Sequence, residues 1–216
     1  MTTESEQPGE HARSVHQNLH HLPFGRRVEP RYDFGAWSTF PYEFDGLQRI
    51  RVLDEPVLPE PPRKGEPGGA ECTACATSDE AQLWTDELWR VHALSEPSAS
   101  PAVVILEPRA HCDLGDLPAR ESAQLGPLIQ RIERAILGLG GVGRVHVMRW
   151  GDGASHLHWW FLARPEGMLQ MRGAFMPIWD DVLPALDHAT WQGNLARIAA
   201  ALAADGGTAH FTLGSE

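Results

Sequence analysis

Three short motifs, far apart in the chain, carry residues that can bind a metal ion, and they constrain the fold more than any other feature. Cys72 and Cys75 form a CxxC motif, His111 follows in EPRAH, and His156 and His158 stand in SHLHWWF. A CxxC turn supplies two thiolates from one short segment, and two distant histidines complete the tetrahedral shell of two nitrogens and two sulfurs that zinc favours. The fold must therefore bring the motifs together around one structural zinc ion.

The spacing of the last two histidines predicts different roles for them. Side chains two residues apart on a β-strand share a face, so a strand over residues 156–158 would point His156 and His158 the same way. We expect His156 to complete the metal site and His158 to remain free for chemistry. Two alternatives stay open: Cys112 replaces His111 if the register shifts by one residue, or His158 replaces His156 as a ligand.

The order of the motifs resembles the histidine triad superfamily, in the zinc-containing branch related to galactose-1-phosphate uridylyltransferase. The matching segments are CTAC (72–75), VVILEPRAHCDLGDL (103–117) and HLHWWFLARP (156–165). One such motif alone would be weak, whereas three in the family's order are specific. The resemblance covers residues 72–165 and implies an antiparallel sheet with one long helix packed on it, a bound zinc ion and a homodimer formed through the sheet and helix.

The resemblance also assigns roles within the last motif. The family's nucleophile is the second histidine of the pair, here His158, whose neutral imidazole attacks phosphorus to give a phosphoramidate that an acceptor then opens. The third position of the family pattern carries His in hydrolases and Gln in transferases, but this chain has Trp160. An indole stacks on rings and donates one hydrogen bond, yet transfers no proton at neutral pH. Either the leaving group needs no proton, or the substrate carries a ring that stacks on Trp160, or catalysis is lost.

Other polar groups near the histidine pair are candidates for binding a phosphorylated substrate. Ser155 is a candidate phosphate contact, and the backbone N–H groups of residues 151–155 are candidates for an anion-binding nest. Arg149 and Arg164 are candidate oxyanion partners, because a guanidinium group binds oxyanions in bidentate fashion; solvated arginines at strand ends are the alternative. The acidic residue that binds ribose in nucleotide-binding relatives has no counterpart beyond Glu96.

Composition bounds the size, the partners and the compartment. A chain of 216 residues with 42% hydrophobic content can build one sizeable core with an appended layer, rather than two full domains. The net charge of −11 argues against nucleic acid as a partner, while a small phosphorylated or nucleotide-like ligand stays compatible. Three cysteines do not make a secreted disulfide framework, and no segment has the apolar length of a signal peptide or membrane span. We therefore expect a cytoplasmic protein.

Polarity and turn residues divide the chain into three parts. Residues 1–23 are polar and rich in histidine, and we expect them to be disordered until they dock on a surface. Residues 24–71 form an extension, with a strand or two in 24–53 and a linker rich in Pro and Gly over 54–71. Residues 72–216 form the main domain.

The hydrophobic pattern predicts an α+β fold, because strands, a long helix and further strands follow one another. Strands joined as two hairpins are expected at residues 87–94, 102–108, 143–150 and 156–163. A long helix is expected over residues 118–139, with a kink or restart at Gly126 and Pro127, and a C-terminal helix over 190–204.

The metal motifs and the resemblance together imply a zinc-containing nucleotidyltransferase, or a hydrolase of nucleotides or other phosphoesters, that acts through a covalent intermediate on His158. One alternative is a non-catalytic, zinc-stabilised binding or scaffold protein in which Trp160 marks a ligand pocket without turnover. Another is an enzyme of a specialised pathway that acts on a non-nucleotide phosphoester.

Overall fold

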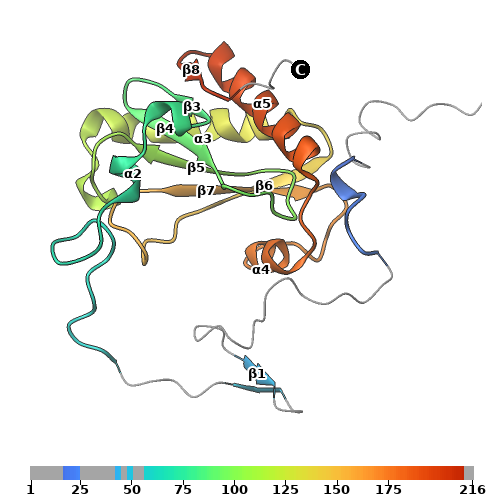
Figure 1. The fold of residues 1–216 in the computed structure, drawn as a ribbon, viewed down its shortest axis with the longest axis horizontal. Helices are drawn as coiled ribbons and strands as arrows, with labels where there is room; N and C mark the ends of the chain where they lie inside the picture. The colour runs from blue at the N-terminus through green and yellow to red at the C-terminus, as the bar shows by residue number, and fades with distance from the viewer. Residues whose placement is uncertain (1–16, 25–41, 45–47, 51–55, 212–216) are drawn as a thin grey trace, which may run out of the picture.

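The structure of the chain is a computed structural model that describes residues 17–24, 42–44, 48–50 and 56–211 (Figure 1). The predicted disorder of residues 1–16 therefore lies outside the described residues. Within the predicted extension, β1 (Tyr42–Phe44) and β2 (Gln48–Ile50) pair as a small antiparallel sheet.

A six-stranded antiparallel sheet forms the centre of the main domain, with the strand order β6-β7-β5-β4-β3-β8 (Figure 1). Its strands are β3 (Trp84–Thr85), β4 (Trp89–Ala93), β5 (Val103–Pro108), β6 (Val142–Met148), β7 (Trp159–Pro165) and β8 (Thr208–Ala209). The register places Val91 opposite Leu106 and Ile105 opposite Trp160. Both predicted hairpins, β4-β5 and β6-β7, are confirmed, and so is the α+β class.

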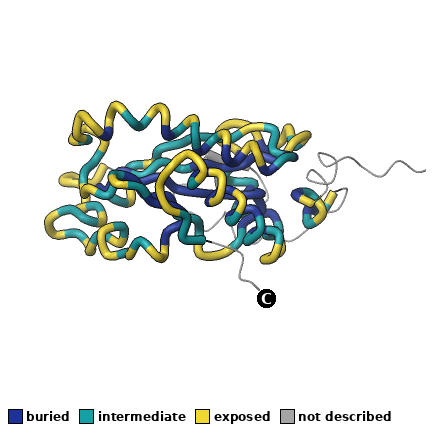
Figure 2. The backbone as a smooth tube through the Cα atoms, turned by 90° about the horizontal axis from the view of Figure 1, so that it is seen from above, coloured by how far each residue is buried: buried dark blue, intermediate teal, exposed yellow. Residues whose placement is uncertain are grey.

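Helices cover both faces of the sheet. The long helix α3 (Ala119–Leu137) and the C-terminal helix α5 (His188–Ala204) lie on one face, and the short helix α4 (Phe175–Val182) lies on the other (Figure 1). All six residues of β5 are buried, as expected for a strand covered on both sides. Figure 2 shows the same arrangement as a buried centre of strands beneath helices whose outer sides are exposed.

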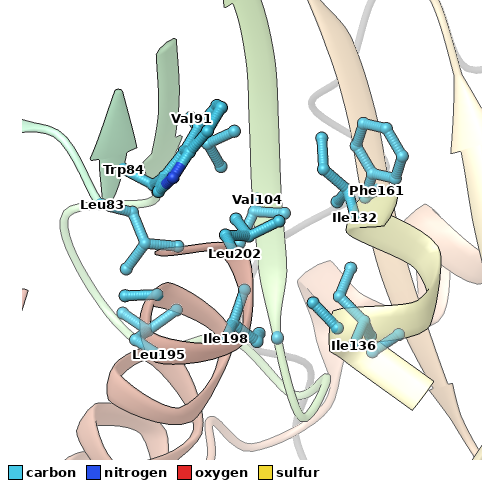
Figure 3. Packing of buried hydrophobic residues seen from close by; sticks show 14 of the residues in the cluster. Leu83, Trp84, Val91, Val104, Ile132, Ile136, Phe161, Leu195, Ile198 and Leu202 are labelled. Atoms are coloured by element: carbon cyan, nitrogen blue, oxygen red, sulfur yellow. The ribbon is translucent and has the colours of Figure 1, made fainter. Parts of the chain in front are cut away.

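The main core lies between the sheet and the two long helices. Ile132 and Ile136 repeat at helical spacing on α3, and Leu195, Ile198 and Leu202 do the same on α5 (Figure 3). All five are buried against strand residues that alternate toward this face, among them Val91, Val104, Leu106 and Phe161. The apolar face that the sequence predicted for the C-terminal helix is therefore confirmed.

Helix α3 continues through Pro127, so of the predicted kink or restart at this position the restart is wrong. Proline removes one backbone hydrogen bond and destabilises a helix interior by about 3 kcal/mol. Gly126 and Pro127 are exposed, so water can reach the carbonyl group that proline leaves unpaired. Leu128 and Ile132 are buried on the sheet directly afterwards, and this packing holds the helix in one piece.

A second apolar cluster covers the other face of the sheet and includes part of the predicted tail. Leu22 packs there with Val103 and Leu162 of the sheet and with Met176 of α4. Asn18 donates a side-chain hydrogen bond to the Gly140 carbonyl at 3.2 Å. Residues 17–24 thus dock on the domain. Among the helices of the described ranges, none combines the length and apolar character needed to cross a membrane.

Candidate metal centre

Four of the side chains that the sequence predicted as metal ligands converge at one end of the sheet. Cys72 caps the N-terminus of the one-turn helix α2 (Thr73–Ala76), Cys75 lies within it, and the Cys75 N–H donates to the Cys72 thiol at 3.5 Å. His111 lies in the loop after β5, and His156 lies in the segment that leads into β7. The ligand atoms of these four residues all lie within 4.8 Å of one another.

The spacing of the ligand atoms fits a small tetrahedral ion. Nδ1 of His156 lies 3.5 Å from the sulfur atoms of both Cys72 and Cys75, and Nδ1 of His111 lies 3.3 Å from the sulfur of Cys75. Zinc bonds of about 2.3 Å to sulfur and 2.0–2.1 Å to nitrogen give a tetrahedral edge of about 3.5 Å. These three separations therefore match edges of a shell of two thiolates and two imidazoles.

Hydrogen bonds and burial prepare His156 to act as a ligand. Its Nε2 lies 2.8 Å from the Pro108 carbonyl, which only accepts, so Nε2 carries the proton and Nδ1 presents its lone pair to the thiols. Burial lowers the pKa of His156, which favours the neutral ring. For Cys75, burial and the neighbouring Cys72 thiol raise the pKa to about 11. Without a cation this thiol stays protonated, so the cluster needs a metal charge to form thiolates.

Of the alternative ligands, the structure brings His111 and His156 to the two cysteines. The Cys112 thiol is turned away from the cluster and donates to the Ala110 carbonyl at 3.6 Å. His158 is also outside the cluster. The Ser155 hydroxyl, which the sequence placed at a phosphate, instead donates to the Lys64 carbonyl at 3.2 Å and lies 3.4 Å from His111 Nε2. Ser155 therefore contacts His111 at Nε2, the ring nitrogen that does not face the thiol of Cys75.

The histidine pair does not lie on a strand, so this prediction is wrong. Strand β7 begins at Trp159, because the preceding residues bond to other segments: the Ser155 N–H donates to the Lys64 carbonyl at 3.0 Å, and the Leu157 N–H to the Cys112 carbonyl at 2.8 Å. Nδ1 of His158 lies 2.8 Å from the His156 carbonyl and must be the donor. In the neutral tautomer that this bond selects, the lone pair of His158 is on Nε2.

His158 lines a pocket of about 280 Å³ beside the metal cluster. The other residues around this pocket come from the linker, from α2, from strands β4 and β5 and from the segment before β7: Lys64, Cys72, Thr73, Ala74, His92, Ile105, Glu107, Gly153, Ala154 and His156. An adjoining pocket of about 350 Å³ shares Thr73, Ala74, His92 and Glu107 with it. The two hollows adjoin each other along α2 and β4 and together make the candidate ligand site.

Two ionisable side chains that the sequence reasoning missed, His92 and Glu107, line both hollows of this site. Arg90 and Glu107 face each other across β4 and β5 at 3.3 Å, and both are nearly buried. Burial raises the pKa of Glu107 to about 7, although the Arg90 charge opposes this shift. Burial lowers the pKa of His92 to about 4, and the charge of Arg90 adds to this effect. The sequence signal for Arg90, His92 and Glu107 is that each is an ionisable residue within an otherwise buried strand.

Trp160 lies next to His158 but does not line its pocket. The two ring centres are 6.4 Å apart at an interplanar angle of 75°, and the Trp160 ring also lies 5.7 Å from that of Trp150. The indole packs against the second apolar cluster. Its Nε1 is buried and has no hydrogen-bond partner among the described residues.

The two predicted oxyanion partners, Arg149 and Arg164, do not line the pocket of His158. Arg149 forms a short ion pair with Asp113, which also accepts from Arg63 at 2.8 Å. Burial alone would raise the pKa of Asp113, but these bonds and the Leu114 N–H lower it to about 2. Arg164 lines a different pocket, because five intervening residues along an extended chain separate it from His158 by about 20 Å.

Comparisons with known proteins found similarity among solved structures. No family model matches the chain, and no curated protein matches it. A histidine triad protein from Bradyrhizobium japonicum is 20% identical, with 56% of this chain and 89% of that chain covered and a TM-score of 0.46. A zinc-bound histidine triad family protein from Mycobacterium smegmatis is 21% identical, with coverages of 62% and 94% and a TM-score of 0.43. A uridylyltransferase is 20% identical, with coverages of 61% and 44% and a TM-score of 0.44. The first two bear the name of the superfamily that the sequence motifs resemble.

Proposed function

We propose that this chain is a histidine triad-like, zinc-containing enzyme that transfers or hydrolyses a nucleotidyl or other phosphoryl group through a covalent intermediate on His158. The single observation that carries the proposal is the hydrogen bonding and position of the His158 imidazole. Its Nδ1 is bonded to the His156 carbonyl, and its ring lines a pocket beside the metal cluster. A neutral imidazole held in this way is a competent nucleophile at Nε2.

Zinc bound by Cys72, Cys75, His111 and His156 would be structural. Four protein ligands close a tetrahedral shell and leave no position for substrate, so the ion would supply folding energy and keep the two thiolates unreactive. The same histidine that would bind the metal through Nδ1 presents its carbonyl to His158. Metal binding would therefore fix the direction of the nucleophile.

The reaction would proceed in two substitutions at phosphorus. Nε2 of His158 attacks, a P–N bond forms, and the P–O bond to the leaving group breaks with its electron pair on the departing oxygen. Water or another acceptor then attacks the phosphorus, the P–N bond breaks, and Nε2 regains its lone pair. Lys64, the only lysine of the chain, is the cationic residue of the linker that lines the pocket and would offset phosphate charge.

A second function is favoured by Trp160. An indole cannot protonate a leaving group, and here its N–H has no hydrogen-bond partner among the described residues. A zinc-stabilised binding protein would use the same pocket without turnover. The enzyme would act only on substrates whose leaving group departs without a proton.

Intact-protein mass spectrometry would test the choice between enzyme and binding protein. The chain would be incubated briefly with nucleoside diphosphate sugars, dinucleoside polyphosphates and nucleoside phosphoramidates. The enzyme proposal predicts an acid-labile nucleotidyl adduct that maps to His158 and is absent from His158→Ala. His188→Gln is a matched control, because His188 is an exposed histidine on α5. Absence of an adduct, with binding of the same compounds retained, would establish the binding protein instead.

A further inference from the structure

A second pocket, of about 420 Å³, lies where strands β6 and β7 meet the loop that follows β7. Its ionisable lining consists of Arg144, His146, Arg164, Glu166 and Arg172, and it shares no lining residue with the pocket of His158. Three guanidinium groups beside one carboxylate make this a positive hollow in a chain whose net charge is −11.

The sheet register forces these positive groups together. Arg144 lies directly opposite Arg164, and His146 lies opposite Leu162 on the same pair of strands. Side chains that are opposite each other, or two residues apart, share a face of the sheet. Like charges directly opposite each other destabilise a strand pair, so this arrangement needs a compensating negative charge.

Arg164 is the buried member of the group. Only 7% of this residue is exposed, and its Nη1 atom donates to the carbonyls of Pro165 at 3.1 Å and Met168 at 3.3 Å. Burial lowers the pKa of Arg164, and the charges of Arg172 and Arg144 lower it further. The buried charge is thus surrounded by like charges.

Within the described ranges, arginines commonly pair with carboxylates, and the three arginines of this pocket differ from the others in this respect. Six arginines elsewhere form ion pairs with Asp or Glu: Arg63, Arg90, Arg109, Arg120, Arg131 and Arg149. No ion pair of Arg144, Arg164 or Arg172 occurs among the residues that the structure describes. The Nε2 atom of His146 is also buried there without a hydrogen-bond partner.

We propose that this pocket is a phosphate-binding site, separate from the site of His158. Guanidinium groups match the oxygens of phosphate in bidentate fashion, and the net charge of the lining, +2 when Glu166 is counted, equals that of a phosphate dianion in magnitude. The phosphate is either free in solution or carried on a small ligand. The site does not depend on the function proposed above, because none of its residues takes part in that chemistry.

Isothermal titration of the full chain with inorganic phosphate, at low ionic strength, tests the site. Arg144→Gln and Arg172→Gln are the informative variants, because both residues are exposed and their loss leaves the fold intact. Each should weaken phosphate binding by about tenfold or more, as expected when a charged hydrogen-bond donor is lost. Arg120→Gln removes an exposed arginine paired with Glu87 at 2.7 Å and should leave the affinity unchanged.

His158→Ala separates this site from the other pocket and should bind phosphate with the wild-type affinity. Titration of the same variants with AMP distinguishes the sources. AMP binding that is tighter than phosphate and depends on Arg144 indicates a phosphate carried on a ligand, and equal affinities indicate the free ion. The proposal is overturned if the wild type does not bind phosphate at 10 mM, a concentration roughly tenfold above a weak dissociation constant of ~1 mM. It is equally overturned if both arginine variants bind as the wild type does, or if only His158→Ala loses binding.

Discussion

Removing His156 and His158 one at a time should separate metal binding from chemistry. His156 is 2% exposed and provides one of the four ligand atoms. Loss of a supporting residue weakens a metal site by up to ~100-fold, so loss of a ligand should cost at least about 3 kcal/mol at about 1.4 kcal/mol per tenfold. The Pro108 carbonyl also loses its partner, which costs about 1–3 kcal/mol. We expect His156→Ala to lower the free energy of unfolding by about 4–6 kcal/mol.

His158→Ala should behave differently, because His158 is only partly buried and contributes one hydrogen bond to a backbone carbonyl. Its loss should cost about 1 kcal/mol. For a chain of this size 1 kcal/mol corresponds to about 2–4 °C in Tm. The expected decreases are therefore roughly 10–20 °C for His156→Ala and at most about 4 °C for His158→Ala.

Elemental analysis and thermal unfolding, measured on the same preparations, provide the assay. The wild type and His158→Ala should each contain about one zinc per chain, and His156→Ala should contain much less. A His156→Ala protein with full metal content and unchanged Tm would refute the reasoning. Metal loss in His158→Ala alone would show that the two histidines have exchanged roles.

Three further predictions concern the metal, the third triad position and the pH dependence. A chelator should lower the Tm, and stoichiometric zinc should restore it while magnesium, which prefers oxygen ligands, should not; full Tm in metal-free protein would contradict this. If the site is catalytic, Trp160→His should speed reactions of substrates with poor leaving groups by ~10²–10⁴-fold and leave good leaving groups almost unchanged. Because Trp160 packs outside the pocket of His158, the ligand affinity should change little; equal rates across leaving groups would limit Trp160 to packing. Because the pKa of His92 is lowered from 6.5 to about 4 in the folded chain, its contribution to stability is present above pH 6.5 and is lost as the pH falls toward 4. Urea midpoints at pH 7 and pH 5 should therefore show His92→Gln gaining stability relative to the wild type at the lower pH, and parallel changes in both proteins would exclude His92 as the cause.

The metal cluster could be predicted from sequence because few residue types bind zinc, and their identity does not depend on the path between them. The sequence therefore identifies the candidate ligands without knowledge of any distance between them: Cys72, Cys75, His111 and His156. The strands and long helices were predictable for a similar reason, since their apolar periodicity survives in any fold that buries them.

The local placement of side chains was not predictable, because it depends on bonds between distant segments. His156 was expected on a strand, but Pro108 ends β5 and offers no N–H for further pairing, and the segment bonds to Lys64 and Cys112 instead. Arg164 was expected near His158 from its proximity in sequence. An extended strand instead carries a residue away from its neighbours at about 3.3 Å per position.

The contacts that the linker makes were also not predictable from its sequence. Its composition predicted an extended chain, yet Arg63 donates to Asp113 and to the Gly151 carbonyl, both at 2.8 Å. Lys64 pairs with Ala154 as an isolated parallel bridge. No local pattern identifies an ion pair across 50 residues, because either partner alone is a typical solvated residue.

Helix α2 has no buried residue, so the walls of the His158 pocket differ in how firmly they are held. The core strands and the helices α3 and α5 are held by apolar packing, whereas α2 depends on the bonds of Cys72, which caps it, and of Cys75, which lies within it. Without metal, α2 should open as a separate unit of local unfolding while the rest of the domain stays folded. Amide hydrogen exchange in the metal-free protein would then be fast in Thr73–Ala76 and slow in β5 and α5. The availability of metal would thus determine whether the His158 pocket is formed, while the rest of the chain stays folded in either case.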